Sequence, residues 1–543
     1  MFEDRYDGEL CIPIYKCPSH EWMRAVSDCC EAQGYEVKRG GSNLRTWRVA
    51  QKARISSDLY YVEAISVSPE DLGAARGEQY IGLAPVRLYF QNGSETPSAE
   101  REATLLGAHR KPKTNPSRII DGIIALGHAL AQSGGFEHLR GERLDDERSL
   151  VTMTVARGAG STFPLAADMW SPTLKNGWRL VVPSVNIHFI ADGAHPGASD
   201  IFSNYQTKLK EKWVNATKNS GSLNIKAFEL GSFLERARSV DAKPERYSDN
   251  DVFVIAVTGA KGEPLPPMQA ELMSILDSWR QQYRIVSLTT KKSGDYWLSN
   301  HALSILNAVG VPYSLKLPFP DNFNDGAFFG VDIGHDHKNR VSKIVVAVIS
   351  PGGRLITSVS QSGILDESIN GGLIMHLLQS ARDRAEDVRG KKFNKAIVIR
   401  DGRLPNNNML KTLETTDNYV NAMGIPTSLV ELRKNQNPPI FRNGEQGIAV
   451  GASFSPGIQN IRYATFYDSK VGMATTFKVV TPKGGDTLGW GVDAYVQILC
   501  GLCYTPSLGS QAHLPGPIYW ADGFAKTSST DNRFRGHDVH IIE

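Results

Sequence analysis

The chain has 543 residues, too many for one ordinary domain, and this length predicts about three or four domains. Hydrophobic residues make up 41% and charged residues 22% of the sequence, which is typical of globular proteins. No uninterrupted apolar run approaches the roughly 18 residues that would span a membrane, and the N-terminal segment lacks an apolar signal core. We therefore expect a cytoplasmic protein that does not interact with membranes.

The net charge of +3, from 60 basic and 57 acidic residues, does not by itself indicate a nucleic-acid-binding protein. Any such binding would have to come from local basic clusters. Six cysteines are few for this length, and the Cys500–Cys503 CxxC pair has no second pair at zinc-ligand spacing. We expect reduced thiols that mainly pack.

Residues 1–240 combine strand-like and helical patterns without an internal repeat, so we expect a mixed α+β region. The polar segment 241–251 is the expected boundary with the next unit. The patterns lie at 59–67, 81–90 and 178–190 for strands and at 117–134 for a helix.

From residue 251 onward, strands and helices alternate. Their βαβαβ order predicts a small parallel sheet. The expected strands are 252–259, 283–290 and 311–316, and the expected helices are 268–282 and 296–310.

A second unit follows the Pro-rich spacer after residue 316. It shows three strands, a helix, a strand, a helix and a strand, which is the order of an RNase H-like core. The strands are expected at 327–334, 342–351, 354–363, 395–402 and 427–434, with helices at 373–388 and 492–505.

Two acids stand on matching strands of this unit. Asp332 lies on the first strand and Asp401 ends the fourth, so the two carboxyl groups are expected side by side at one edge of the sheet. Phosphodiester hydrolysis in such a core uses acids that hold two divalent ions about 4 Å apart, and Asp and Glu are suitable hard ligands. Either aspartate alone is explained as a strand-end turn cap, which is the better explanation for an isolated DG such as 401–402, but the pair favours a site.

Three short motifs then resemble the PIWI domain of Argonaute proteins: GVDIGHD (330–336), VIRDG (398–402) and HLPGPIYWADGFA (513–525). The resemblance implies a catalytic tetrad, in which three of the acids bind metal. Tyr519 stands one place earlier than in the family pattern, and Asp366 competes with the glutamate of the tetrad. The implied tetrad is Asp332, Glu367, Asp401 and Asp522, with Asp332, Asp401 and Asp522 as the metal ligands.

The resemblance also implies the fold class, which is α/β. An RNase H-like PIWI domain at 326–543 would follow a Rossmann-like MID domain at 251–316 and the mixed α+β N-terminal region at 1–240. Because 240 residues are few for the family's N, PAZ and linker segments, we expect a compact prokaryotic form without a full PAZ domain.

In the family, the MID domain holds the 5′ end of a guide strand, usually with lysines that are absent from residues 268–282 here. Other basic residues would have to replace them, although each is also explained as surface charge. A 5′-hydroxyl preference or an unusual phosphate pocket is therefore a hypothesis. The expected guide-binding residues are Lys261, Arg284, Lys291, Lys292, Asn307, Arg433, Lys434 and Arg442.

The resemblance implies a guide-directed endonuclease. It would bind a short DNA or RNA guide and cleave a complementary DNA or RNA target with two Mg²⁺ or Mn²⁺ ions, in host defence. The alternative is a catalytically silent guide-binding sensor that acts through an effector protein. The altered guide-end residues favour the sensor, whereas the retained acids oppose it. An unrelated RNase H-like nuclease or recombinase would leave the 251–316 unit unexplained.

Overall fold

In the computed structural model, the chain divides into two compact units. Unit 1 comprises residues 1–150, 432–481 and 491–496, and unit 2 comprises 151–431, 482–490 and 497–543. The structure describes residues 10–19, 22–40, 43–47, 53–55, 57–73, 75, 77–95, 97, 116–139, 142–143, 154–156, 162–164, 184–194, 198–217, 221–240, 247–248, 250–257, 265–279, 281, 283–287, 301–302, 305, 314–317, 319–336, 341–353, 355–364, 370–404, 414–434, 437–442, 453–468, 473–503 and 514–530.

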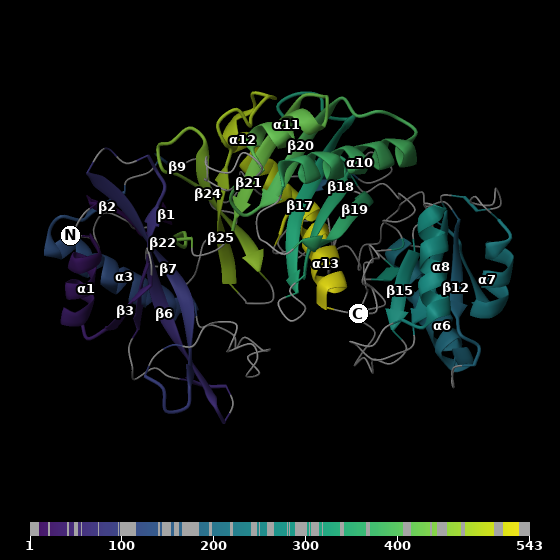
Figure 1. Cartoon of the computed structure of the whole chain (residues 1–543), viewed down its shortest axis with the longest axis horizontal. Coiled ribbons are helices and arrows are strands. Elements are labelled where there is room, and N and C mark those ends of the chain that lie inside the picture. The colour runs from purple at the N-terminus through teal and green to yellow at the C-terminus, as the bar shows by residue number, and fades with distance from the viewer. Residues whose placement is uncertain are drawn as a thin grey trace. The chain divides into compact units, whose positions relative to one another are not determined.

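Unit 2 contains the expected RNase H-like core. Five strands pair in the order β19-β18-β17-β20-β21, in which β17, β18 and β19 are antiparallel and β20 runs parallel to β17 (Figure 1). This order confirms the prediction from sequence. The strands are β17 (Gly326–Asp336), β18 (Val341–Ile349), β19 (Leu355–Ile364), β20 (Lys395–Asp401) and β21 (Thr427–Arg433).

Helix α10 (Gly371–Arg389) covers one face of these strands, together with α11 (Thr416–Ala422). Asn370 caps α10, because its side chain accepts hydrogen bonds from the first backbone N–H groups, and Gly390 ends it at a φ of 63°. Phe329 and Val331 of β17 pack against Ile374 of α10 in one buried cluster. The opposite face of β17 contacts α13 (Gly516–Thr530), and α12 (Gly491–Leu502) precedes it in the chain.

A four-stranded parallel sheet, in the order β13-β12-β14-β15, forms the Rossmann-like part of unit 2. Helix α6 (Ala198–Thr217) packs on one face, where Phe189 contacts Tyr205. Helices α7 (Leu230–Arg238) and α8 (Pro267–Ser278) pack on the other. The strands are β12 (Val185–Ala191), β13 (Leu223–Glu229), β14 (Asp251–Val257) and β15 (Tyr283–Ser287).

The membership of this sheet differs from the prediction. The sheet begins at Val185, so the polar segment 241–251 connects two parts of one sheet. The expected third strand is wrong as part of the parallel sheet, because β16 (Ser314–Lys316) pairs antiparallel with β10 (Thr154–Ala156), and β11 (Thr162–Pro164) pairs with β10 in turn. Three residues carry too little pattern to indicate so distant a partner. Most of the expected helix 296–310 lies outside the described residues.

Unit 1 is built on an antiparallel sheet in the order β3-β4-β6-β7-β2-β8, with β5 also paired to β6. Helices α1 (Trp22–Ala32) and α3 (Pro116–Ser133) share a buried cluster with it, which confirms the mixed α+β prediction. The strands are β2 (Ile14–Pro18), β3 (Glu36–Gly40), β4 (Asn43–Trp47), β5 (Ala53–Arg54), β6 (Leu59–Glu70), β7 (Glu78–Gln91) and β8 (Glu137–His138).

Unit 1 also contains shorter pairings. A run of four strands has the order β25-β24-β23-β9, and β1 pairs with β22. Their bounds are β1 (Leu10–Cys11), β9 (Glu142–Arg143), β22 (Phe441–Arg442), β23 (Ser453–Ser455), β24 (Ile461–Asp468) and β25 (Met473–Val480).

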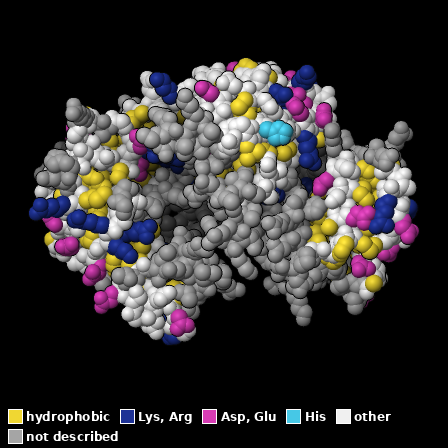
Figure 2. All heavy atoms as spheres, viewed as in Figure 1, with side chains coloured by type: hydrophobic (Ala, Val, Ile, Leu, Met, Phe, Trp, Pro, Cys, Tyr) yellow, Lys and Arg dark blue, Asp and Glu magenta, His cyan; other side chains and the backbone are white. Residues whose placement is uncertain are grey.

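The distribution of surface charge and the state of the two CxxC thiols agree with what the composition indicates. On the face shown in Figure 2, Lys and Arg side chains are interspersed with Asp and Glu side chains. Cys500 and Cys503 are buried free thiols, and burial raises the pKa of Cys500 to about 12, so both thiols pack as neutral groups. Within the part of the chain that the structure describes, no helix has the length and apolar character needed to cross a membrane.

A buried ion pair joins distant parts of the unit 1 sequence. Lys478 Nζ lies 3.0 Å from Glu70 Oε2, and their side chains are only 4% and 7% exposed. The Tyr463 hydroxyl donates a hydrogen bond of 2.7 Å to the same oxygen. Burial and the neighbouring carboxylate of Glu70 raise the pKa of Tyr463, which keeps this hydroxyl a donor.

We predict that Lys478→Met destabilises unit 1 by about 3 kcal/mol, because it leaves the Glu70 carboxylate buried without its cation. Urea unfolding followed by tryptophan fluorescence measures the change. Exposed Lys483 provides the matched control, and Lys483→Met should leave the midpoint unchanged. Unfolding of the two variants at the same urea concentration would contradict a stabilising role for the Glu70–Lys478 pair.

Candidate metal centre

Asp332 lies in the middle of β17, where it pairs with Val345 of β18. Side chains alternate between the two faces of a strand, so Phe329 and Val331 share one face, where both pack into the cluster with α10. Asp332 has the opposite parity and is 8% exposed. Its Oδ1 accepts a 2.9 Å hydrogen bond from the backbone N–H of Ile333, which holds the carboxylate in place.

Asp401 is the last residue of β20, directly beside β17. The parallel register pairs Val331 with Arg400, so Asp401 follows at the level of Asp332. The next residue, Gly402, has a φ of 87°, a left-handed conformation that favours glycine and turns the chain immediately after the acid. The DG pair therefore both ends the strand and presents a half-buried carboxylate at its edge.

Asp522 comes from α13 and is 8% exposed. One carboxylate oxygen from each of Asp332, Asp401 and Asp522 lies within 4.8 Å of the other two. Three carboxylates so close repel one another unless a cation neutralises them. Their oxygen atoms are the hard ligands that Mg²⁺ and Mn²⁺ prefer, so the donor set fits a divalent metal ion.

Two glycines bring α13 close enough to complete this cluster. Gly330 and Gly334 lie two residues on either side of Asp332 and therefore share its side of β17. A Cβ atom at Gly330 would overlap the backbone carbonyl of Pro517, and a Cβ atom at Gly334 would lie 2.8 Å from the carbonyl of Ala525. Figure 1 shows α13 running beside β17, in agreement with their contacts.

A buried polar network holds the end of β20. Arg400 forms an ion pair with Glu414, whose carboxylate also accepts a hydrogen bond from the Tyr419 hydroxyl. Arg400 Nη1 donates 2.7 Å to the backbone carbonyl of Asp401. Burial lowers the pKa of Arg400, but Tyr419 and Glu414 outweigh this effect and raise it overall. Arg400 thus stays charged and fixes the backbone that carries Asp401.

Tyr519 lies one turn before Asp522 on α13. Burial and the negative charge of Asp522 raise the pKa of the Tyr519 hydroxyl. The motif residue therefore remains a neutral phenol beside the acids.

The structure brings three of the four expected catalytic residues together: Asp332, Asp401 and Asp522. Glu367 and its competitor Asp366 lie outside the described residues. The three clustered acids come from three different elements, β17, β20 and α13, separated in sequence but adjacent in the fold.

The expected guide-binding residues are described only in part. Arg284 on β15 is 7% exposed, with Nη1 donating 2.9 Å to the carbonyl of Tyr283, so its place is in the sheet and not on the open surface. Arg433 ends β21 and is half-buried, as is Lys434. Arg442 belongs to β22, without a described side chain. The others lie outside the described residues: Lys261, Lys291, Lys292 and Asn307.

No protein-family model matches the sequence, and no curated protein matches it. Solved structures do match. Marinitoga piezophila Argonaute in complex with a 5′ OH guide RNA and target DNA is 11% identical, with a TM-score of 0.59 over 92% of this chain and 84% of that one. Drosophila Piwi is 11% identical, with a TM-score of 0.60 over 95% and 85%. Clostridium butyricum Argonaute, bound to a guide DNA and a 19-mer target DNA, is 11% identical, with a TM-score of 0.58 over 94% and 85%.

The chain therefore has the fold of Argonaute and Piwi proteins, extended over nearly its whole length. This confirms the fold class that the acid motifs implied, an α/β chain with an RNase H-like core and a Rossmann-like sheet. At 11% identity the likeness concerns the fold.

Sequence reasoning missed the supporting residues of the site. The G-V-D-I-G alternation at 330–334 was a visible signal, because two glycines on the side of the acid indicate a close backbone approach. Arg400 and Glu414 left no such signal, since a charged pair 14 residues apart reads as surface charge.

We predict that Gly330→Ala destabilises the protein by about 2 kcal/mol, because its methyl group would overlap the α13 backbone. Thermal unfolding in EDTA measures this without any metal contribution. Gly523→Ala is the matched control: it lies next to Asp522 on α13, its added Cβ would meet nothing within 4 Å, and alanine favours the helix. Equal melting temperatures for Gly330→Ala and the wild type would contradict the close approach.

Proposed function

We propose that this chain is a guide-directed endonuclease that binds a short DNA or RNA guide and cleaves a complementary strand, acting in the cytoplasm in host defence. The observation that carries the proposal is the cluster of Asp332, Asp401 and Asp522 within 4.8 Å at the edge of an RNase H-like sheet. The similar Argonaute structures that contain guide RNA or guide DNA and target DNA support the choice of partners.

The proposed active site is completed by Glu367, and Asp332, Asp401 and Asp522 would hold the metal. Two Mg²⁺ or Mn²⁺ ions, when bound, would supply charge stabilisation and an activated water for phosphodiester hydrolysis. The chain's own contribution is positional. The Ile333 N–H orients the Asp332 carboxylate, and Arg400 holds the Asp401 backbone.

The guide end is proposed to lie at the Rossmann-like sheet, in a domain that includes β12 to β15 and continues to residue 316, with the RNase H-like domain at 326–543. Ligands of open α/β sheets bind outside the carboxyl ends of the strands, near the point where the strand order reverses. Here that point lies between β12 and β14. Lys261 follows β14 in the sequence, and Lys291 and Lys292 follow β15, which supports their assignment to the guide end.

The absence of lysine from residues 268–282 supports a guide with a 5′ hydroxyl, as in the guide RNA of the Marinitoga piezophila complex. The second candidate function is a guide-binding sensor that acts through an effector protein. The absence of lysine from residues 268–282 also favours this sensor function. The clustered acids favour cleavage, because a silent protein gains nothing from three mutually repelling carboxylates.

The test is a cleavage assay in Mn²⁺ or Mg²⁺ that crosses DNA and RNA guides, each with a 5′ phosphate or 5′ hydroxyl, against labelled DNA and RNA targets. We predict one guide-dependent cut at a fixed position. Asp401→Asn should lower its rate about 10³-fold or more, because it removes a ligand charge and keeps the side-chain shape. Guide affinity should stay unchanged.

Asp417 is exposed on α11 and does not belong to the acid cluster, so Asp417→Asn serves as the charge-matched control and should cleave at the wild-type rate. Tight guide binding without a cut for any combination would overturn the nuclease proposal and favour the sensor. Equal loss of guide binding and stability in Asp401→Asn would instead make Asp401 a structural residue.

A further inference from the structure

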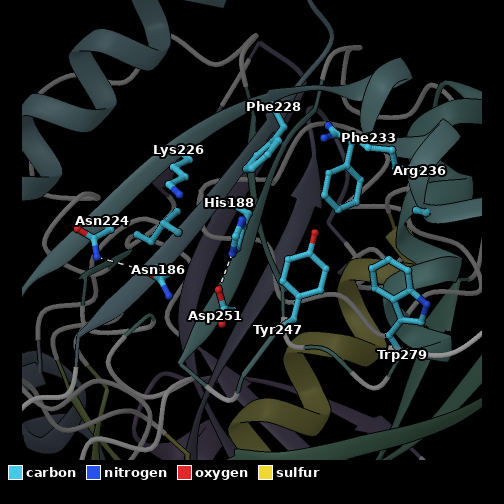
Figure 3. A pocket seen from close by; sticks show the side chains of 12 residues that line it. Asn186, His188, Asn224, Lys226, Phe228, Phe233, Arg236, Tyr247, Asp251 and Trp279 are labelled. Carbon is cyan, nitrogen blue, oxygen red and sulfur yellow. Dashed lines mark hydrogen bonds and ion pairs between the residues drawn. The ribbon is translucent and has the colours of Figure 1, made fainter. Parts of the chain in front are cut away.

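A cavity of about 280 Å³ lies at the amino ends of the parallel strands, on the side covered by α7 and α8 (Figure 3). Toward the carboxyl ends of the strands, apolar residues such as Ile190 and Ile255 face these helices. Within their first four residues, the pattern becomes polar on three adjacent strands. The polar lining residues are Asn186 and His188 on β12, Asn224 and Lys226 on β13, and Asp251 on β14.

The polar floor of the cavity is a buried pair. His188 Nε2 lies 2.6 Å from Asp251 Oδ1, and the two residues are 8% and 5% exposed. Burial raises the pKa of Asp251, but hydrogen bonds from His188 and Ser248 outweigh it and lower the pKa overall. The carboxylate therefore accepts from Nε2.

The second ring nitrogen of His188 has no partner among the residues that the structure describes. Nδ1 is buried, and among the described residues no group hydrogen-bonds to it. A buried polar atom without a partner costs free energy in the empty protein, and a ligand in the cavity that supplies a partner would recover it.

Aromatic rings surround this floor. His188 stacks on Phe253 with ring centroids 4.9 Å apart, and Tyr247 meets the imidazole edge-on at 5.2 Å. Phe228, Phe233 and Trp279 also line the cavity, and Figure 3 shows their rings gathered around Tyr247. Such rings provide flat apolar surface on which a planar heterocycle packs.

Two cations complete the lining. Lys226 on β13 and Arg236 on α7 are both exposed, and the Arg236 guanidinium lies 5.8 Å from the centre of the Phe228 ring. Arg236 Nε donates to the Ser232 carbonyl of its own helix, which leaves its terminal nitrogens for another acceptor. Figure 3 shows Lys226 and Arg236 on either side of Phe228, and each can bind a phosphate group through charge-assisted hydrogen bonds.

Two amides add hydrogen-bonding groups on the Lys226 side of the cavity (Figure 3). Asn224 Nδ2 donates 3.2 Å to Asn186 Oδ1. This bond leaves the Asn186 amino group as a donor and the Asn224 oxygen as an acceptor, a pair that matches the edge of a nucleobase.

We propose that this cavity binds a nucleoside monophosphate group, with its base against the aromatic rings and its phosphate at the rim that carries Lys226 and Arg236. The ligand is either a free nucleotide or the terminal nucleotide of a strand, since both carry the same chemistry. The site lies at the opposite ends of the strands from the proposed guide end, so it is a second site. The proposal does not depend on cleavage.

The test is isothermal titration of the full chain, without guide or metal, with AMP, GMP, CMP and UMP and, separately, with adenosine and inorganic phosphate. Saturable binding of at least one nucleotide, tighter than either fragment, is expected. Lys226→Ala and Arg236→Ala should each weaken it about tenfold, the loss expected for a hydrogen bond to a charged group. Phe228→Leu, which keeps apolar volume and removes the ring, should also weaken it.

Lys210→Ala is the matched control, because Lys210 is an exposed lysine on α6, which packs on the other face of the sheet. It should bind like the wild type. Repeating the titration with guide-loaded protein separates the two sources. Loss of nucleotide binding assigns the site to a strand end, and unchanged binding assigns it to a free nucleotide.

Three outcomes would overturn the proposal: no saturable nucleotide binding, phosphate alone binding as tightly as a nucleotide, or cavity variants that bind like Lys210→Ala. Circular dichroism shows whether each variant is folded, so a loss of binding is not confused with unfolding. Failure here leaves the guide-directed cleavage proposal intact, because that proposal is tested with guide, target and metal.

Discussion

The contact between β17 and α13 is the constraint on which the acid cluster depends. Asp522 reaches the sheet only because Gly330 and Gly334 carry no side chain where the α13 backbone crosses. The residue between them, Asp332, then faces the same helix that supplies Asp522. The two faces of β17 therefore have different roles. The apolar face packs against α10, and the face with the glycines and Asp332 packs closely against α13 and carries a carboxylate. The packing that stabilises unit 2 and the geometry that gathers the carboxylates are therefore the same feature.

The position of Asp401 depends on a second feature, the buried ion pair of the preceding residue, Arg400, with Glu414. A buried Arg400–Glu414 pair is costly to desolvate and contributes little net stability compared with apolar packing. Its position explains its presence better than its energy does, because Arg400 bonds the carbonyl of the residue that carries the acid. The network therefore fixes the backbone at the strand end, from which the Asp401 side chain joins the acid cluster.

The order of strands in the RNase H-like core, and with it the pairing of Asp332 and Asp401, could be predicted from the sequence, because long apolar runs separated by turn residues mark each strand. Asp522 needed the family resemblance, since nothing in the pattern around it indicates a helix that crosses β17. The parallel sheet begins earlier in the chain than predicted, because it also contains β12 and β13. Strand β13 alternates Asn224, Lys226 and Phe228 on its cavity side, which breaks the apolar signal of a buried strand. The partner of β16 depends on a contact across more than 150 residues, which local pattern does not carry.

The most direct test of the acid cluster is a crystal structure of the protein soaked in Mn²⁺, with anomalous difference density calculated at the manganese edge. We expect a peak bounded by carboxylate oxygens of Asp332, Asp401 and Asp522, with α13 still against Gly330 and Gly334. An anomalous map with no peak at these three aspartates, while Mn²⁺ occupies other sites of the same crystal, would contradict it.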